Sequence, residues 1–149
     1  MQQAVSARAP AHLWIVGILS LLWNSFGAYD YVMSRMRNTD YFKSMMPDVD
    51  PQAMLNYIDS FPIWVSFGWG LGVWLGLAGS VLLLIRSRHA VWAFGLSLIG
   101  AILGLGYQLA NPMPGLEGFM ATGMPIVIIL VAAFLAWYSW NAQKKGLLR

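Results

Sequence analysis

Cysteine is absent from the 149-residue sequence, and charged residues are scarce. Without a thiol, the chain can form no disulfide, thiolate metal site or thiol redox centre. Asp, Glu, Lys and Arg make up only 10% of the residues, whereas a soluble domain carries about 25%. Hydrophobic residues make up 58%, which excludes a disordered chain. So few charges cannot cover the surface of a soluble domain, and the composition predicts an integral membrane protein.

Four long stretches contain no Asp, Glu, Lys or Arg: residues 9–29, 60–85, 89–116 and 118–143. About 20 apolar residues in a helix cross a bilayer, so each stretch can cross once but not twice. In lipid, a helix satisfies its own backbone hydrogen bonds. We therefore predict an all-α, integral membrane four-helix bundle, with residues 1–149 forming a single transmembrane domain. The expected spans are residues 12–34, 62–85, 90–110 and 118–141.

The few charges are sorted by sign between the two sides of the predicted spans. One side carries only basic residues, which are Arg8, Arg86, Arg88, Lys144, Lys145 and Arg149. All the acidic residues belong to the first and third loops or, as with Asp30, to their margin. The positive-inside rule then places both termini in the cytoplasm. The net charge of +3 reflects this sorting, and without a basic cluster among aromatic residues no nucleic-acid partner is expected.

The loop between the first two spans contains the pattern of a short amphipathic helix. Asp50 followed by Pro51 is a typical helix start. Apolar residues follow at spacings i, i+3, i+4 and i+7, namely Met54, Tyr57, Ile58 and Phe61. We expect this helix to lie on the outer membrane face, where it either seals the rim of the bundle or presents a surface to a partner.

Small residues recur at helical spacing in the second and third spans. They include Gly68, Gly72, Gly76 and Ser80, followed by Ser97, Gly100, Ala101 and Gly104. Small side chains at this spacing let helix backbones approach closely in lipid. Packing inside one bundle is the simpler interpretation, and a homo-oligomer face or a groove for a flat ligand is the alternative.

Polar residues of the first span are the main candidates for binding. A stripe of small and polar residues comprises Gly17, Ser20, Asn24, Gly27 and Tyr31. Asn24 lies near mid-depth, where it either lines a substrate path or bonds another helix, with Gln108 as a candidate partner. Asp30 is the only acid that a span could carry into the membrane, where a carboxylate can serve as a proton relay or a cation ligand.

Several motifs resemble a known family. They are Trp23-Asn24-x-x-Gly27-x-x-Asp30-Tyr31, Pro62-x-Trp64, Gly79-Ser80-x-x-Leu83-Leu84-x-Arg86-x-x-x-Ala90 and Phe94-x-x-Ser97-Leu98. Together they resemble a family of small four-span bacterial inner-membrane proteins that are often labelled "sugar transporter". The resemblance covers most of Trp14 to Tyr107 and implies a location in the bacterial inner membrane. It carries over no catalytic or binding residue, although Asn24, Asp30 and Arg86 are polar positions of the motifs.

The candidate binding residues are therefore Asn24, Asp30, Tyr31, Arg86 and Gln108. No P-loop, nucleophile elbow, HExxH motif or pair of intramembrane carboxylates is present, so we expect neither an enzyme nor a metal site. No cofactor is expected. His12 and His89 lie at the same membrane face and leave open a quinone- or haem-binding redox subunit.

The favoured function is that of a non-enzymatic membrane protein that acts by helix–helix association, as an accessory or scaffold component of a larger complex. The alternative is a carrier for a small, sugar-like molecule. One chain of four helices is expected to pack solidly along its axis, so a carrier would need a path between the protomers of a homo-oligomer.

Overall fold

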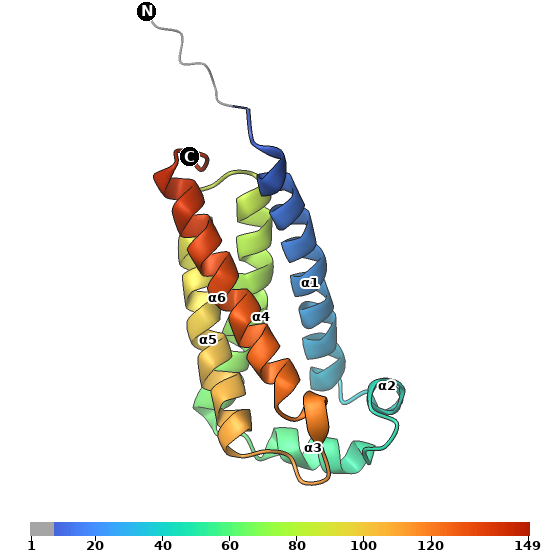
Figure 1. Cartoon of the computed structure of the whole chain (residues 1–149). Helices are drawn as coiled ribbons and strands as arrows, with labels where there is room; N and C mark the ends of the chain where they lie inside the picture. The colour runs from blue at the N-terminus through green and yellow to red at the C-terminus, as the bar shows by residue number, and fades with distance from the viewer. Residues whose placement is uncertain (1–7) are drawn as a thin grey trace, which may run out of the picture.

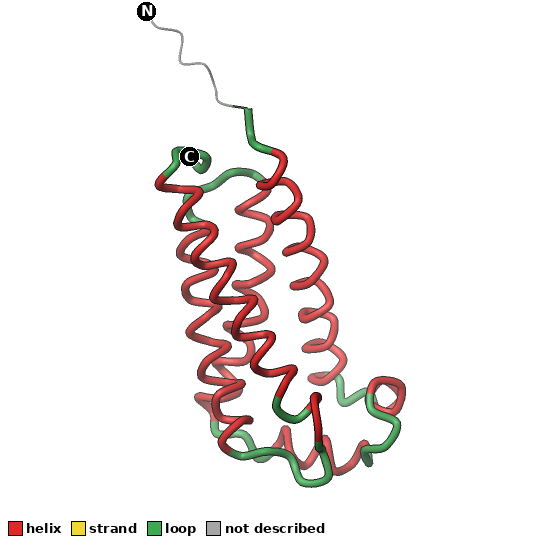
Figure 2. Tube along the Cα trace, viewed as in Figure 1, coloured by secondary structure: helices red, strands yellow, loops and turns green. Residues whose placement is uncertain are grey.

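The computed structural model describes residues 8–149, and this part of the chain consists of helices joined by short loops, as Figure 2 shows. The helices are α1 (Ala11–Arg35), α2 (Thr39–Met45), α3 (Pro51–Asp59), α4 (Ile63–Leu84), α5 (Ala90–Ala110), the 3₁₀ helix η1 (Gly118–Met120) and α6 (Gly123–Lys144). α1, α4, α5 and α6 are long and apolar enough to cross a membrane. The predicted all-α fold with four spans is confirmed.

The four long helices pack in chain order, with α1 beside α4, α4 beside α5 and α5 beside α6. Figure 1 shows the C-terminus and the start of α1 at one end of the bundle, which we call the terminal end. The helices α2, α3 and η1 lie at the opposite end, which we call the loop end. Among the described residues, α1 packs mainly on α4, and it meets α6 through His12 and Tyr138 near the terminal end.

Two apolar clusters hold the ends of the bundle. The cluster at the terminal end joins all four long helices through Leu13, Leu83, Ala90, Phe94 and Leu135. At the loop end, the cluster packs α2 and α3 against the loop after α5 and comprises Tyr41, Phe42, Met54, Leu55 and Met113. The bundle is therefore tightly packed at the terminal end and is capped by short helices at the loop end.

Glycines allow α4 and α5 to pack with their backbones in contact. A Cβ atom on Gly100 would lie 2.5 Å from both the Gly68 carbonyl oxygen and the Gly72 nitrogen. A Cβ atom on Gly72 would in turn lie 3.1 Å from the nitrogen of Ala101. Ser97 adds a hydrogen bond of 2.6 Å from its hydroxyl to the Gly72 carbonyl oxygen. The small-residue stripes thus lie at a contact within one chain, where van der Waals packing can hold helices together.

The fourth span begins later than predicted. Residues Gly118–Met120 form η1, and α6 starts only at Gly123. Gly118 has a φ of +73°, which is outside the α-helical region, so the α-helix of the fourth span cannot begin at this residue. Pro125 lies in the first turn of α6, where the missing backbone N–H costs nothing.

The loop between α1 and α4 holds one helix more than predicted. α3 matches the expected amphipathic segment. At the start of α3, the Asp50 carboxylate accepts a hydrogen bond from the backbone nitrogen of Gln52. The unpredicted helix is α2, whose first turn is capped by Asn38 accepting a hydrogen bond from the Tyr41 nitrogen at 3.0 Å. An asparagine at this position is a strong helix-start signal, and it could have been found in the sequence.

Candidate binding cavity

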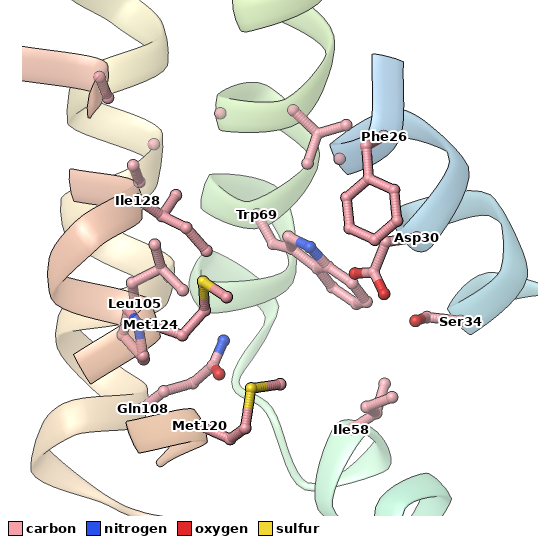
Figure 3. Close-up of a pocket in the computed structure, with 18 of the residues that line it drawn as sticks. Phe26, Asp30, Ser34, Ile58, Trp69, Leu105, Gln108, Met120, Met124 and Ile128 are labelled. Atoms are coloured by element: carbon pink, nitrogen blue, oxygen red, sulfur yellow. The ribbon is translucent and has the colours of Figure 1, made fainter. Parts of the chain in front are cut away.

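A cavity of about 360 Å³ lies between α1 and α6 in the half of the bundle nearer the loop end. Every helix contributes to its wall. Figure 3 labels Phe26, Asp30 and Ser34 from α1, Ile58 from α3, Trp69 from α4, Leu105 and Gln108 from α5, Met120 from η1, and Met124 and Ile128 from α6. The expectation of solid packing along the bundle axis is therefore wrong in this half.

α1 and α6 contact each other near the terminal end, and the cavity lies between them nearer the loop end. At the terminal end, His12 Nδ1 and the Tyr138 hydroxyl form a hydrogen bond of 2.5 Å, with the two rings edge to face. Farther toward the loop end, residues of both helices line the cavity, among them Asp30 of α1 and Met124 of α6 (Figure 3). The cavity is not fully enclosed, and Phe26 in its wall is 54% exposed. Met120 of η1, also in the wall, is 39% exposed, so the open side of the cavity borders α1 and the segment that leads into α6.

Asn24 stands at the inner edge of the cavity in a hydrogen-bonded group that joins α1 to α4. The hydroxyls of Ser20 and Ser80 lie 2.6 Å apart, and Ser80 is completely buried. The Asn24 amide donates to the Ser80 hydroxyl at 3.0 Å and to the Ser20 carbonyl oxygen at 2.9 Å. The suggested partner Gln108 takes no part in this group. Asn24 therefore fixes α1 against α4 while it lines the cavity.

Asp30 is the only aspartate or glutamate among the described residues of the cavity wall. The Tyr41 hydroxyl donates a hydrogen bond of 2.6 Å to Asp30 Oδ1. Burial, together with this hydrogen bond, raises the pKa of the Tyr41 hydroxyl above its usual value, so Tyr41 stays a proton donor. Among the described residues, Arg37 and Asp59 form the one ion pair. Asp30 thus has no cationic partner within residues 8–149.

Gln108 extends from α5 toward the cavity, across from α1 (Figure 3). Its side chain makes no hydrogen bond to another described side chain, and it is only partly buried. An amide can donate and accept at once. It is thus a second polar group with bonding capacity left for a bound molecule.

Tyr31 and Arg86, the other two predicted binding residues, lie outside the cavity wall. The Tyr31 ring packs edge to face on Trp69, with centroids 4.8 Å apart. Arg86 is at the end of α4 with a φ of +61°, and its Nε donates to the Leu147 carbonyl oxygen at 2.9 Å. The Arg86 carbonyl oxygen also accepts a hydrogen bond of 2.7 Å from the backbone nitrogen of Arg149. Arg86 thus holds the C-terminal tail against the loop after α4.

The histidines that suggested a haem lie in different surroundings at the terminal end. The His12 ring is hydrogen-bonded to Tyr138, as described above. His89 precedes the first turn of α5, where its backbone N–H donates to the Ser87 hydroxyl. Within residues 8–149, no cluster of three or more metal-ligating side chains is present. Neither histidine is part of the cavity wall.

Sequence reasoning missed several residues of the cavity wall, including Tyr41, Trp69, Met120 and Met124. The capping signal at Asn38 could have placed Tyr41 on a helix near the end of α1. No comparable signal exists for the methionines, because a methionine in an apolar segment reads as a core residue.

Comparison with protein-family models, with curated proteins and with solved structures finds no match for this chain. The resemblance to small bacterial inner-membrane proteins therefore stays a prediction. The function has to be inferred from the geometry and chemistry of the cavity itself.

Proposed function

We propose that this membrane protein binds a small, largely apolar molecule inside the bilayer, in the cavity between α1 and α6. The observation that carries the proposal is the cavity of about 360 Å³. Small-molecule sites have volumes of about 300–1,000 Å³ and combine an apolar wall with a few polar groups. This wall follows that pattern, with Asp30 and Gln108 among residues such as Phe26, Leu105 and Ile128.

The separation of α1 from α6 supports entry from the membrane. The loop end is covered by α2, α3 and η1, and the terminal end is closed by the cluster around Leu13 and Leu135. The side between α1 and α6 carries exposed apolar residues such as Phe26. A molecule dissolved in lipid could therefore reach the cavity sideways, without crossing a packed layer.

The sorting of charges supports an orientation with the terminal end in the cytoplasm. Arg86, Arg88 and Lys144 are at the terminal end, and the acidic residues belong to the loop end or its margin. By the positive-inside rule, α2 and α3 would then lie on the outer face. We propose the bacterial inner membrane as the location on the basis of the motif resemblance.

The scaffold role and the homo-oligomeric carrier are the alternatives. Both relied on the small-residue stripes as a face for association. Because Gly68, Gly72 and Gly100 lie between α4 and α5, they offer that association no support. A carrier would also not need a second copy to form a cavity. Binding by one chain is therefore the simpler proposal, without enzymatic activity.

A reporter inside the cavity tests the proposal. The chain has no cysteine, so Ala132→Cys in the cavity wall can be labelled with a trifluoromethyl group and followed by ¹⁹F NMR in phosphatidylcholine nanodiscs. Leu130→Cys is the matched control, because Leu130 is 62% exposed and outside the wall. We expect the neutral probe 1-naphthol to shift the signal at 132 saturably and the signal at 130 only in proportion to its concentration.

A second variant asks whether the free space is needed. Gly27 lines the cavity, and a Cβ atom added there meets no atom within 4 Å. We expect Gly27→Leu to fill the cavity and abolish the saturable shift. Gly106→Leu, at an open position outside the wall, should leave it unchanged. A signal at 132 that behaves like the signal at 130 would contradict the proposal.

A further inference from the structure

The charge balance of the cavity wall is uneven. Asp30 is the only carboxylate in the wall, and no Lys, Arg or His of residues 8–149 accompanies it. A carboxylate in an apolar setting is unfavourable unless it is paired or hydrogen-bonded. Tyr41 meets part of this need through one hydrogen bond to Oδ1. Among the described side chains nothing donates to Oδ2, so the wall leaves a negative group with capacity for a positive partner.

Aromatic rings line the same cavity as this carboxylate. Figure 3 shows Phe26 and Asp30 extending from α1 toward the cavity, and Trp69 of α4 belongs to the same wall. Trp69 is held edge to face by Tyr31 and by Phe61, at centroid distances of 4.8 and 6.4 Å. The faces of such rings attract cations within about 6 Å. A cavity that holds a carboxylate and aromatic rings favours an organic cation over a neutral polyol.

The opposite wall is soft and, apart from the Gln108 amide, apolar. It is formed by Leu105 of α5, Met120 of η1, and Met124 and Ile128 of α6 (Figure 3). Methionine side chains adapt to ligands of irregular shape. This wall suits an apolar body. A sugar would lose its hydrogen bonds to water there, and an organic anion would meet the Asp30 carboxylate with no basic residue to offset it.

We propose that the cavity binds lipophilic organic cations, with the charged centre beside Asp30, Phe26 and Trp69 and the apolar groups against α5 and α6. This inference rests on the proposed function and specifies the class of its ligand. Asp30 contributes the charge, the rings contribute the cation–π faces, and Tyr41 orients the carboxylate.

Two probes of matched shape and opposite charge test the proposal. Tetraphenylphosphonium is a lipophilic cation, and tetraphenylborate is an anion of nearly the same size. With the ¹⁹F label at 132 in phosphatidylcholine nanodiscs, we expect a saturable shift with the cation and none with the anion. The label at 130 corrects for partitioning of either ion into lipid.

Substitution of the carboxylate gives the deciding result. We expect Asp30→Asn to weaken binding of tetraphenylphosphonium by about 30-fold or more, because a buried charge pair loses one partner. Asp48→Asn is the matched control, since Asp48 is an exposed acid outside the cavity wall. It should leave binding unchanged.

A second variant covers the case in which Asp30→Asn fails to fold. Phe26 is 54% exposed, so Phe26→Leu should fold normally while it removes one ring from the site. We expect it to weaken cation binding about two- to fivefold.

Equal binding of the two ions, or cation binding that neither variant weakens, would overturn the inference. In that case saturable binding of 1-naphthol would leave the proposed function standing. If 1-naphthol also gave no saturable shift, both proposals would fall.

Discussion

The α4–α5 contact and the α1–α6 opening are two pairs of membrane helices with opposite outcomes. α4 and α5 pack along their length, with glycine backbones so close that a Cβ atom on Gly100 would overlap Gly68 and Gly72. α1 and α6 meet at His12 and Tyr138, and nearer the loop end both line a cavity. All four helices are apolar enough to cross a membrane. Hydropathy therefore does not decide which helices close upon each other.

The difference lies in side-chain size and in polar bonds. Lipid solvates apolar side chains as well as a neighbouring helix does, so only close van der Waals packing or hydrogen bonds hold two spans together. The α4–α5 contact has both, through its glycines and the bond from Ser97 to the Gly72 carbonyl. The α1–α6 pair has large side chains such as Phe26 and Ile128 facing each other across the cavity.

The largest loss of stability is expected from Gly100→Ala, which breaks the closed side of the comparison. Its Cβ atom would meet backbone atoms of α4 at 2.5 Å, and backbone cannot move aside as a side-chain end can. We expect a loss of about 3 kcal/mol, the upper end of typical over-packing costs. Unfolding of the purified protein in mild detergent measures it.

Gly106→Ala is the control for that variant, because its added Cβ atom meets nothing within 4 Å. It should leave stability unchanged or raise it by up to about 1 kcal/mol through helix propensity. An equal effect of the two substitutions would show that close packing of α4 and α5 is not what stabilises the pair.

A smaller loss is expected from Tyr138→Phe, which removes the hydrogen bond between α1 and α6 at the terminal end and leaves the apolar cluster there in place. The variant keeps the ring and removes the hydroxyl that bonds His12, at a cost of about 1 kcal/mol. The distribution of distances between spin labels near the terminal ends of α1 and α6 should also become broader. Tyr29→Phe, at an exposed tyrosine with no hydrogen bond to another described side chain, should change neither quantity. A narrow, unchanged distance in Tyr138→Phe would contradict this role of the hydroxyl.

The smallest effect is expected at the ion pair that ties the end of α1 to the end of α3. Arg37 donates two hydrogen bonds to Asp59, at 2.8 and 3.0 Å, and both side chains are about half exposed. Arg37 lowers the pKa of the Asp59 carboxyl below its ordinary value. The stabilisation is therefore complete above that ordinary value, about pH 4, and is lost as the pH falls further.

Thermal unfolding at pH 7 and at pH 3 checks this effect, with Asp59→Asn beside the wild type. The variant should be slightly less stable at pH 7, and the difference should shrink at pH 3 and in high salt. Asp48→Asn, which removes a carboxylate that makes no ion pair in the described part of the chain, should follow the wild type. A difference that grows at low pH would exclude this ion pair as its source.

The spans and α3 could be predicted because they depend on properties of single residues. Charge-free stretches of sufficient length mark the spans, and Asp50 with Pro51 marks the start of α3. The cavity could not be predicted, because it depends on how far apart two helices lie. Asn24 illustrates the limit. Its need for a partner follows from its depth, but the sequence does not say that Ser80 rather than Gln108 meets that need.

Because the packed cluster lies at the terminal end and the cavity lies nearer the loop end, the protein would present different surfaces to the two leaflets of a bilayer. In one leaflet, a lipid-soluble molecule meets the packed surface around Leu13 and Leu135. In the other leaflet, it meets the opening beside Phe26. A protein of this shape would sample one leaflet only. The side from which a compound enters the membrane would then matter as much as its affinity for the cavity.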